Sequence, residues 1–588
     1  MQFLKKHIEA ISLILLLLVC FFLYFFAMGE YSLVDVDESR YIAIARDMIN
    51  ANDWLTLRLN GEFFFEKPPL YFWLINLSFL LFHKISEFTA RFPIALLSTI
   101  CIFLTYFSVK KMTSRRVGML TALVMATSLE YLILSKVVIL DIVLTVFTTL
   151  SLLCGYLTFF VEGPKRKYLW WGFYILSALG FLAKGIPGVA VPFGVMFFAH
   201  LFSGKLRQIF RPVHLLPGIV LFALISIPWH YIMIKMYSSL FVDQYIMEHH
   251  LARFLTSEHI GRKQPFWFFI PVFLVGILPW TGSFIAMISV QAKNISKFFK
   301  EYFTPFSYEL FDLKWNKLDY PQRFIFLNII AFTLTFLFFS ASSTKLPTYI
   351  LPAIFPAACL LGCFWCDFIY YKQHEKSVLI STNITNGIFI AAALAALFTP
   401  FFLEPELESE IARFRTPVLI LFFFVPMMSI IASIVKNKLL VFLSNVFFMM
   451  CLSVICSLYI FNFMATVGGE NDLIKFAIKA QQEGVKLGNF NFGKKYSLNY
   501  YYDNFIDYQA DFDLDWLTEY FNTYPEGYII IKIKDLKDLD NAGFQYSILE
   551  SGKRYCIIIP PVPAKTEEEE MDEYVKELLG EDTILDNP

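Results

Sequence analysis

Long apolar runs recur along most of this chain, from Ile11 to Phe463. Each is near the twenty residues that an α-helix needs to cross a bilayer, so the pattern predicts a polytopic α-helical membrane protein. The stretch 70–82 is shorter, and its length favours an interfacial or re-entrant helix over a crossing. About thirteen stretches are predicted to span: 10–28, 90–109, 117–134, 138–160, 168–183, 186–202, 213–236, 266–290, 323–341, 347–370, 379–400, 415–435 and 439–463.

The pattern changes after Val467, where charge rises and the long apolar runs stop. Apolar periodicity there predicts helices over 472–482 and near 514–521, and strands over 528–533 and 555–559. Such a mixture indicates a small α/β domain. The predicted organisation is a transmembrane domain over 1–465 with a first outer loop at 29–89, an α/β domain over 466–565, and an acidic tail over 566–588.

Composition agrees with a membrane protein: 57% of the 588 residues are hydrophobic and 17% are charged. The net charge of -1 gives no indication of a nucleic-acid partner. Cys363 and Cys366 form a CxxC, but it lies in an apolar stretch without a second pair of ligands. Because a zinc site needs four converging ligands, we interpret these two cysteines as packing residues.

The distribution of positive charge predicts the topology. Lys5 and Lys6 place the N-terminus inside by the positive-inside rule. If 70–82 does not cross, the basic clusters all fall on that same side, whereas a crossing would place most of them outside. We therefore expect thirteen spans with the C-terminal domain on the outer face. The clusters are 110–116, 165–167, 205–211, 293–300, 372–376 and 436–438.

The outer loops of this arrangement collect charged and polar residues at span ends. An unpaired charge in such a position is costly, so convergence into one cavity is the economical explanation. The alternative is that the outer loops carry whatever charge the inner loops lack. The residues are Asp37, Glu38, Arg40, Glu66, Lys67, Asp141, Lys184, His249, His250, Arg253 and Lys345.

The first outer loop carries the densest cluster. Asp35 or Asp37 is a candidate N-cap for a helix that runs to about Asn50. Asp37 and Arg40 are three positions apart, so the two lie on one face, with Tyr41 beside it. An apolar stripe that begins at Tyr41 predicts that this helix lies along the membrane surface. Before Pro68 the chain leaves helical geometry, which puts Glu66 and Lys67 at a break.

Six segments together resemble a known family. They read D-E-S-R-Y from Asp37, E-K-P-P-L-Y-F-W from Glu66, S-K-V-V-I-L-D ending at Asp141, F-L-A-K-G-I-P-G around Lys184, E-H-H-L-A-R-F around Arg253, and S-S-T-K-L-P-T-Y-I-L-P around Lys345 and Tyr349. In this order they resemble membrane glycosyltransferases of the GT-C class, in the dolichyl-phosphate-mannose protein mannosyltransferase family. The chain is most similar to the bacterial branch that transfers 4-amino-4-deoxy-L-arabinose from undecaprenyl phosphate to lipid A. The resemblance covers roughly residues 10–370.

The resemblance implies a transferase in the inner (plasma) membrane that uses a polyprenyl-phosphate sugar and works on the outer, periplasmic face. It implies catalytic roles for Asp37, Arg40 and Asp141. It also implies donor-phosphate contacts from Lys67, Arg253, Lys345 and Tyr349, whose cations and hydroxyl suit a phosphate leaving group. Substrate contacts are expected from Glu38, Tyr41, Glu66, Lys184, His249 and His250.

No cofactor is required by this chemistry, although Glu66 is a candidate ligand for a divalent metal. The expected acceptor is lipid A or a related glycolipid. A protein O-mannosyltransferase is the alternative within the same class of enzymes. A polytopic transporter is the alternative of another class, but transporters typically have two similar halves, and none is visible here.

Overall fold

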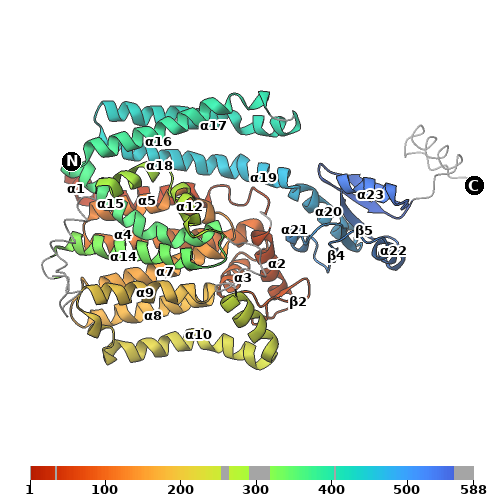
Figure 1. Cartoon of the computed structure of the whole chain (residues 1–588), viewed down its shortest axis with the longest axis horizontal. Coiled ribbons are helices and arrows are strands. Elements are labelled where there is room, and N and C mark those ends of the chain that lie inside the picture. The colour runs from red at the N-terminus through yellow and green to blue at the C-terminus, as the bar shows by residue number, and fades with distance from the viewer. Residues whose placement is uncertain are drawn as a thin grey trace, which may run out of the picture. The chain divides into compact units, whose positions relative to one another are not determined.

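Figure 1 shows the computed structural model, which describes residues 2–33, 36–252, 264–290, 315, 318–402 and 405–561. The chain divides into two units, Met1–Val467 and Gly468–Pro588. The division falls next to the domain boundary expected after residue 465. Each unit is described separately below.

The first unit is built from helices that lie side by side (Figure 1). Their apolar composition suits a lipid environment, where every backbone N–H and C=O must form its hydrogen bond within the helix itself. They are α1 (Gln2–Cys20), η1 (Phe21–Phe25), α2 (Asp37–Asn50), α3 (Leu70–Phe82), α4 (Glu87–Met112), α5 (Arg115–Ala126), α6 (Leu129–Leu134), α7 (Leu140–Leu157), α8 (Lys165–Lys184), α9 (Pro187–Phe202), η2 (Leu206–Gln208), α10 (Pro212–Phe241), η3 (Val242–Ala252), η4 (Phe266–Phe268), α12 (Phe269–Gly276), α14 (Tyr320–Ala341), η6 (Pro347–Ala353), α15 (Ile354–Tyr371), α16 (Glu375–Ala396), η7 (Thr399–Phe401), α17 (Pro405–Ile434), α18 (Lys438–Ile455), η8 (Cys456–Ile460) and α19 (Phe461–Gly468).

Among the described residues, nine helices are long and apolar enough to cross a membrane, or up to ten if a bent pair counts as one span. The unit is therefore polytopic, while the count of thirteen stays a prediction. Helix α3 has the bounds that the sequence predicted. Like α9, it is apolar but shorter than the helices counted as candidate spans.

Two predicted spans are not continuous helices. The stretch 117–134 is divided into α5 and α6, because Thr127 and Ser128 donate their hydroxyls to the carbonyls of Leu123 and Val124 and interrupt the helix. The stretch 266–290 bends by 117° between Phe266–Gly276 and Thr281–Val290. Pro279 lies at this bend and has no N–H to continue the helix.

The first outer loop holds α2, a short antiparallel hairpin of β1 (Arg58–Leu59) and β2 (Glu62–Phe63), and α3. Asp37 is the first helical residue of α2 and Val36 is its N-cap, without a side-chain hydrogen bond. The prediction that Asp37 caps the helix was wrong, and Asp35 lies outside the described residues. Ile42, Ala43 and Arg46 are buried as well as the apolar stripe, so α2 packs within the protein on several sides rather than offering one open face.

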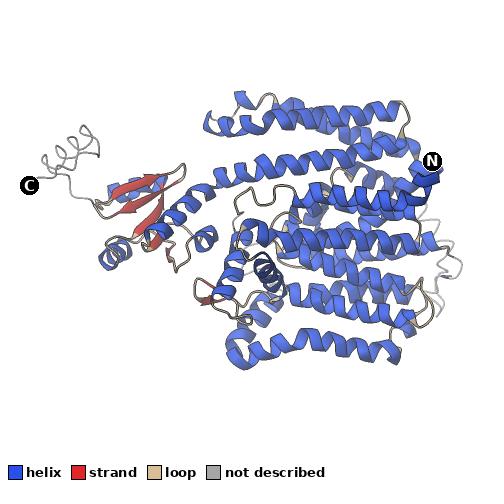
Figure 2. Cartoon of the chain, turned by 180° about the vertical axis from the view of Figure 1, so that it is seen from behind, coloured by secondary structure: helices blue, strands red, loops and turns tan. Residues whose placement is uncertain are grey.

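The second unit is a three-layer α/β domain. Figure 2 shows its strands, which form a five-stranded mixed sheet in the order β4-β3-β5-β7-β6. One face packs on α20 and α21 through Leu473, Phe476 and Leu498, and the other on α22 and α23 through Leu517 and Leu539. The elements are α20 (Glu470–Glu483), β3 (Leu487–Phe490), α21 (Tyr496–Tyr501), β4 (Asp507–Gln509), α22 (Leu514–Thr523), β5 (Tyr528–Lys532), η9 (Ile533–Asp535), α23 (Leu536–Asn541), β6 (Ser547–Ser551) and β7 (Tyr555–Ile559).

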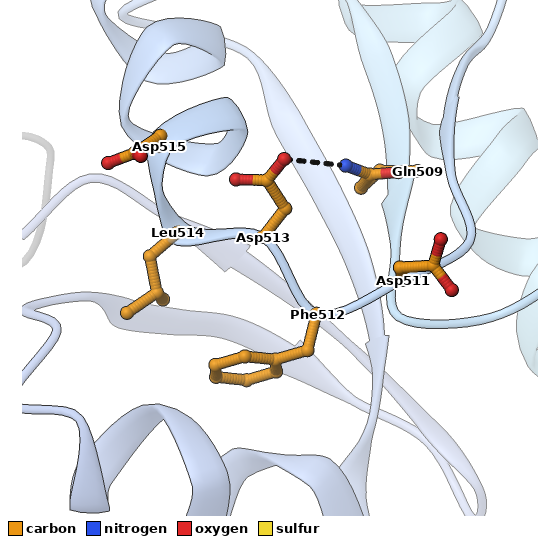
Figure 3. Close-up of a pocket in the computed structure, with 6 residues that line it drawn as sticks. All are labelled: Gln509, Asp511, Phe512, Asp513, Leu514 and Asp515. Atoms are coloured by element: carbon orange, nitrogen blue, oxygen red, sulfur yellow. Dashed lines mark hydrogen bonds between the residues drawn. The ribbon is translucent and has the colours of Figure 1, made fainter.

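Both predicted strands and both predicted helices of this unit are present, and the expected acidic tail lies outside the described residues. A shallow pocket near α22 is lined by three aspartates, Asp511, Asp513 and Asp515 (Figure 3). Asp513 accepts hydrogen bonds from the Trp516 amide at 3.1 Å and from Gln509 at 3.2 Å. Its carboxylate therefore caps α22, and the pocket is explained by that turn.

Candidate functional site

The first charged group of the site lies at the start of α2. Asp37 accepts a hydrogen bond from Arg40 at 2.5 Å, as their spacing predicted. Arg40 also lies 3.8 Å from Glu66, which belongs to the break before α3. The Asp37 side chain is 43% exposed, whereas that of Arg40 is 15% exposed and lies over the rings of Tyr41 and Phe64. This geometry presents one accessible carboxylate beside a fixed guanidinium.

The second charged group joins three helices. Asp141, in the first turn of α7, forms an ion pair with Lys184 in the last turn of α8. Lys184 Nζ lies 4.1 Å from the centre of the Tyr349 ring in η6. Thr348 donates its hydroxyl to Asp141 at 3.2 Å, a partner that the sequence did not indicate. Asp141 is therefore a buried, fully engaged carboxylate, unlike Asp37.

Tyr41 connects the two groups. Its ring packs on Tyr71 and Phe72 of α3 at 5.4 and 5.9 Å. Burial raises the pKa of the Tyr41 hydroxyl, and the charges of Asp37 and Asp141 raise it further. The Val138 amide, three positions before Asp141, donates to Glu38 at 2.9 Å, so the start of α2 lies beside the segment that leads into α7. Tyr41 itself is 4% exposed, so it supports the site as a buried packing residue.

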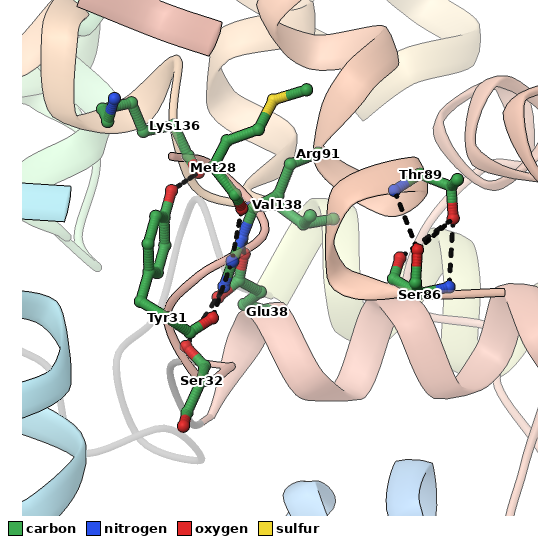
Figure 4. Close-up of polar contacts among 9 residues, drawn as sticks. All are labelled: Met28, Tyr31, Ser32, Glu38, Ser86, Thr89, Arg91, Lys136 and Val138. Atoms are coloured by element: carbon green, nitrogen blue, oxygen red, sulfur yellow. Dashed lines mark hydrogen bonds and ion pairs between the residues drawn. The ribbon is translucent and has the colours of Figure 1, made fainter. Parts of the chain in front are cut away.

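Glu38 was expected to contact substrate, and in the structure it forms a buried ion pair with Arg91. Its side chain is 1% exposed, and both carboxylate oxygens accept from Arg91, at 2.7 and 2.8 Å (Figure 4). The Val138 amide also donates to it at 2.9 Å. Glu38 therefore connects α2, α4 and the segment before α7, and a substrate contact of Glu38 stays a prediction.

Arg91 is a functional support that the sequence analysis missed. It donates to the carbonyls of Met28, Tyr31 and Ser32 at 2.8, 2.9 and 3.1 Å, in addition to Glu38. All five guanidinium N–H donors are thereby used. The available signal was a lone arginine inside a predicted apolar span, since a charge in that position calls for a named partner.

Aromatic packing holds the first loop against α10 and η3. Phe65 packs on Phe241 at 5.3 Å, and Trp229 donates to the Leu55 carbonyl at 3.0 Å. This contact brings η3, and with it His249, toward the segment that carries Glu66. The side chain of His250 and the whole of Arg253 lie outside the described residues.

Two predicted phosphate ligands are already engaged. Lys67 donates to the Glu66 carbonyl at 3.1 Å. Lys345 is 5% exposed and donates to the carbonyls of Ser342 at 2.5 Å and Gln264 at 3.2 Å. Burial lowers the pKa of Lys345. An ammonium has three donors, so one N–H of Lys345 is left for a further acceptor.

The described residues contain no group of three or more His, Cys, Asp or Glu side chains that could hold a metal ion. Glu66 lies beside Arg40 instead, a cation that opposes metal binding. Cys363 and Cys366 are buried free thiols in α15, which agrees with a packing role.

Known proteins can now be compared. Residues 66–232 match the family described as dolichyl-phosphate-mannose-protein mannosyltransferase. An undecaprenyl phosphate-alpha-4-amino-4-deoxy-L-arabinose arabinosyl transferase of Yersinia enterocolitica is 26% identical over 394 residues, which is 65% of this chain and 64% of that protein. The transferase of that name from Aeromonas salmonicida is 28% identical over 386 residues, 64% of each chain. The chain thus spans just under two thirds of the length of the first curated relatives it matches.

Solved structures decide the fold. ArnT from Cupriavidus metallidurans, bound to undecaprenyl phosphate, matches with a TM-score of 0.72 at 20% identity, covering 94% of this chain and 97% of that chain. This chain has the GT-C fold. The archaeal oligosaccharyltransferase AglB from Archaeoglobus fulgidus matches with a TM-score of 0.51 at 12% identity, covering 92% of this chain and 71% of that chain. The resemblance to the aminoarabinose transferase branch, inferred from the six motifs, is confirmed.

Proposed function

We propose that this protein transfers a sugar from a polyprenyl-phosphate donor to lipid A or a related glycolipid, on the outer face of the membrane. The observation that carries the proposal is the presence of two carboxylate–cation pairs, Asp37 with Arg40 at the start of α2 and Asp141 with Lys184 between α7 and α8. One carboxylate is accessible and the other is held by a lysine and a threonine. The names of the relatives support this donor and acceptor.

The reaction needs an acceptor oxygen to attack the anomeric carbon while the bond from that carbon to the phosphate breaks. Polyprenyl phosphate leaves with the bonding electrons. With a hydroxyl acceptor, Asp37 takes the proton as general base. With a phosphate acceptor there is no proton to remove, and Asp37 then orients the acceptor or stabilises positive charge that develops on the sugar. Arg40 orients the Asp37 carboxylate in either case through their hydrogen bond.

The leaving phosphate requires cations that stabilise its growing negative charge. Lys67 and the third N–H of Lys345 supply such donors among the described residues, and Arg253 retains this role as a prediction from the sequence. Lys184 is tied to Asp141, so we assign these two to positioning the sugar together with Tyr349. We also propose that the site faces the periplasm, and the loop-charge pattern supports this location.

The test is a transfer assay with the purified chain. Undecaprenyl phosphate aminoarabinose and lipid A are supplied, and mass spectrometry measures the mass added to lipid A. Asp37→Asn serves as the inactive control. We expect sugar addition by the parent alone, and the proposal fails if lipid A is unmodified by a folded protein that still binds undecaprenyl phosphate.

A protein O-mannosyltransferase is the second candidate, because the family that matches residues 66–232 carries that description. A parallel reaction with polyprenyl phosphate mannose and a Ser/Thr-rich peptide separates the two. Glycopeptide formation without modified lipid A would favour this candidate.

A further inference from the structure

A basic cluster lies at the opposite ends of α7, α8, α9 and α14 from the Asp141–Lys184 pair. Arg166 is in the first turn of α8, Lys205 follows α9, and Arg323 is near the start of α14. Lys205 Nζ and Arg323 Cζ lie 5.3 and 5.4 Å from the centre of the Trp315 ring. Two cations therefore share one indole that is 2% exposed.

Two histidines extend the cluster inward. His200, which is fully buried, lies 4.4 Å from Phe159 between ring centres, and Phe159 lies 5.2 Å from Trp315. His214 stacks on Trp170 at 4.7 Å, and Trp170 also contacts His200. These ring contacts bring four segments together: the one after α7, α9, the start of α10 and the one before α14.

Arg166 donates to the side-chain oxygen of Gln208, but other donors of the cluster have no acceptor among the residues that the structure describes. Within the described residues, five of its buried nitrogen atoms make no hydrogen bond: Arg166 Nε, His200 Nε2, His214 Nδ1, Trp315 Nε1 and Arg323 Nε. Three of these always carry a hydrogen. Leaving a buried donor unpaired is unfavourable, so several in one place show that this part of the protein is short of hydrogen-bond acceptors.

One described carboxylate, that of Glu162, acts on these cations, and its charge raises the pKa of Arg166 and of Lys205 against the larger effect of burial. Glu162, which follows α7, is exposed and forms no ion pair within the described part of the chain. Asp319 accepts from the Gln322 amide at 2.8 Å as the cap of α14. Burial lowers the pKa of Lys205, and the charges of Arg323 and Arg166 lower it further. The positive-inside rule explains exposed positive charge at this end, but not half-buried cations that repel one another around a tryptophan.

The neighbouring surface indicates what kind of anion fits. Phe210, Val213 and Leu216 surround the start of α10 and are 58–61% exposed. Such an apolar surface at the end of a spanning helix suits acyl chains. An anion that enters the cluster beside it carries acceptor oxygens and an apolar tail.

We propose that Arg166, Lys205 and Arg323 bind the phosphate of an anionic phospholipid whose acyl chains lie along α10. The charged ends of these three half-buried side chains donate to its oxygens, and the planar guanidinium suits phosphate. A zwitterionic lipid fits less well, because its own cation would approach a cluster that is already positive. This site is separate from the proposed sugar-transfer site and does not depend on it.

Native mass spectrometry of the full chain tests the site. Phosphatidylglycerol and phosphatidylcholine with the same acyl chains are titrated onto the delipidated protein. We expect the parent to prefer phosphatidylglycerol, and R166Q/R323Q to bind it about ten- to a hundredfold more weakly, as the loss of charged hydrogen bonds requires. Soluble glycerol phosphate is a second probe, and if it competes at equal affinity the site is for free phosphate and the lipid proposal is overturned.

K372Q/K376Q is the matched control. It removes the same charge from two exposed lysines near the start of α16. An equal loss in this control, or no preference for phosphatidylglycerol in the parent, would overturn the proposal. Lys205→Gln decides the matter if R166Q/R323Q does not fold, since it removes one half-buried cation; we expect about tenfold weaker binding, and unchanged binding would count against the site.

Discussion

At the scale of single residues, Asp37 is distinguished from Asp141 by its access to solvent. We predict that Asp37→Asn abolishes transfer and leaves donor binding intact, because an amide keeps the shape but has neither the charge nor the basicity. Asp141→Asn should reduce transfer less, since Lys184 and Thr348 still contact the amide. Single-turnover transfer and binding of undecaprenyl phosphate are measured on both purified variants. Near-normal turnover of Asp37→Asn would remove Asp37 from the catalytic role.

The phosphate ligands give a second prediction at this scale. Lys67→Ala and Arg253→Ala should each weaken binding of the bare polyprenyl phosphate by about 10- to 150-fold, because a charged hydrogen bond contributes about 1.5–3 kcal/mol. Arg253→Lys should recover part of the affinity, since the bidentate fork is lost. Arg58→Ala is the control in the same loop, where Arg58 lies over the Phe63 ring. Equal affinity in both alanine variants would place the phosphate elsewhere, with Lys184 as the next candidate.

At the scale of elements, the Glu38–Arg91 pair fixes α2 against α4. Breaking a buried pair leaves an uncompensated charge, so Glu38→Gln should lower the free energy of unfolding by about 3–5 kcal/mol. Asp47→Asn is the control within α2, where the Asp47 side chain is 25% exposed and its pair with Arg46 should contribute less than the fully buried pair. Thermal unfolding of both variants measures the difference. A similar small effect for both would show that Glu38 does not hold the loop.

In the second unit, α20 is attached to β6 by charge. Hydrogen bonds from Lys475 and Lys479 lower the pKa of Glu550 below its ordinary value. The stabilisation is therefore present above the unfolded-state pKa and lost as pH falls through the folded pKa. Glu550→Gln should increase hydrogen exchange in β6 relative to the parent at pH 7, and this difference should vanish once the pH falls below the lowered pKa that Glu550 has in the folded protein. A difference that persists in acid would mean that the ion pairs do not cause it.

Elements with local signals could be predicted from the sequence, and those set by distant contacts could not. The bounds of α3 and β7 follow from apolar runs between polar residues. Strands β3 and β4 were missed because they are short and are fixed by pairing, β4 with β3 and β3 with β5. Strand β6 was missed because its position is set by pairing with β7. The outer charged residues were found, but the partners Arg91 and Thr348 depend on packing between helices far apart in sequence, and so does the inward turn of Glu38.

At the scale of the whole molecule, the loop charges and the two ends of the helices make one topological prediction. The segments around Lys110, Lys205 and Lys438 should lie inside, and Asp37, Asp141 and everything after Val467 outside. A reporter fused after Lys438 should therefore be active on the opposite side from one fused after Val467, because α18, η8 and α19 together cross once. A third fusion within residues 83–86, after α3, should report the outer face if α3 does not cross. If the fusions after Lys438 and Val467 report the same side, the topology is wrong, and the outer site and the inner basic cluster lose their assigned faces together.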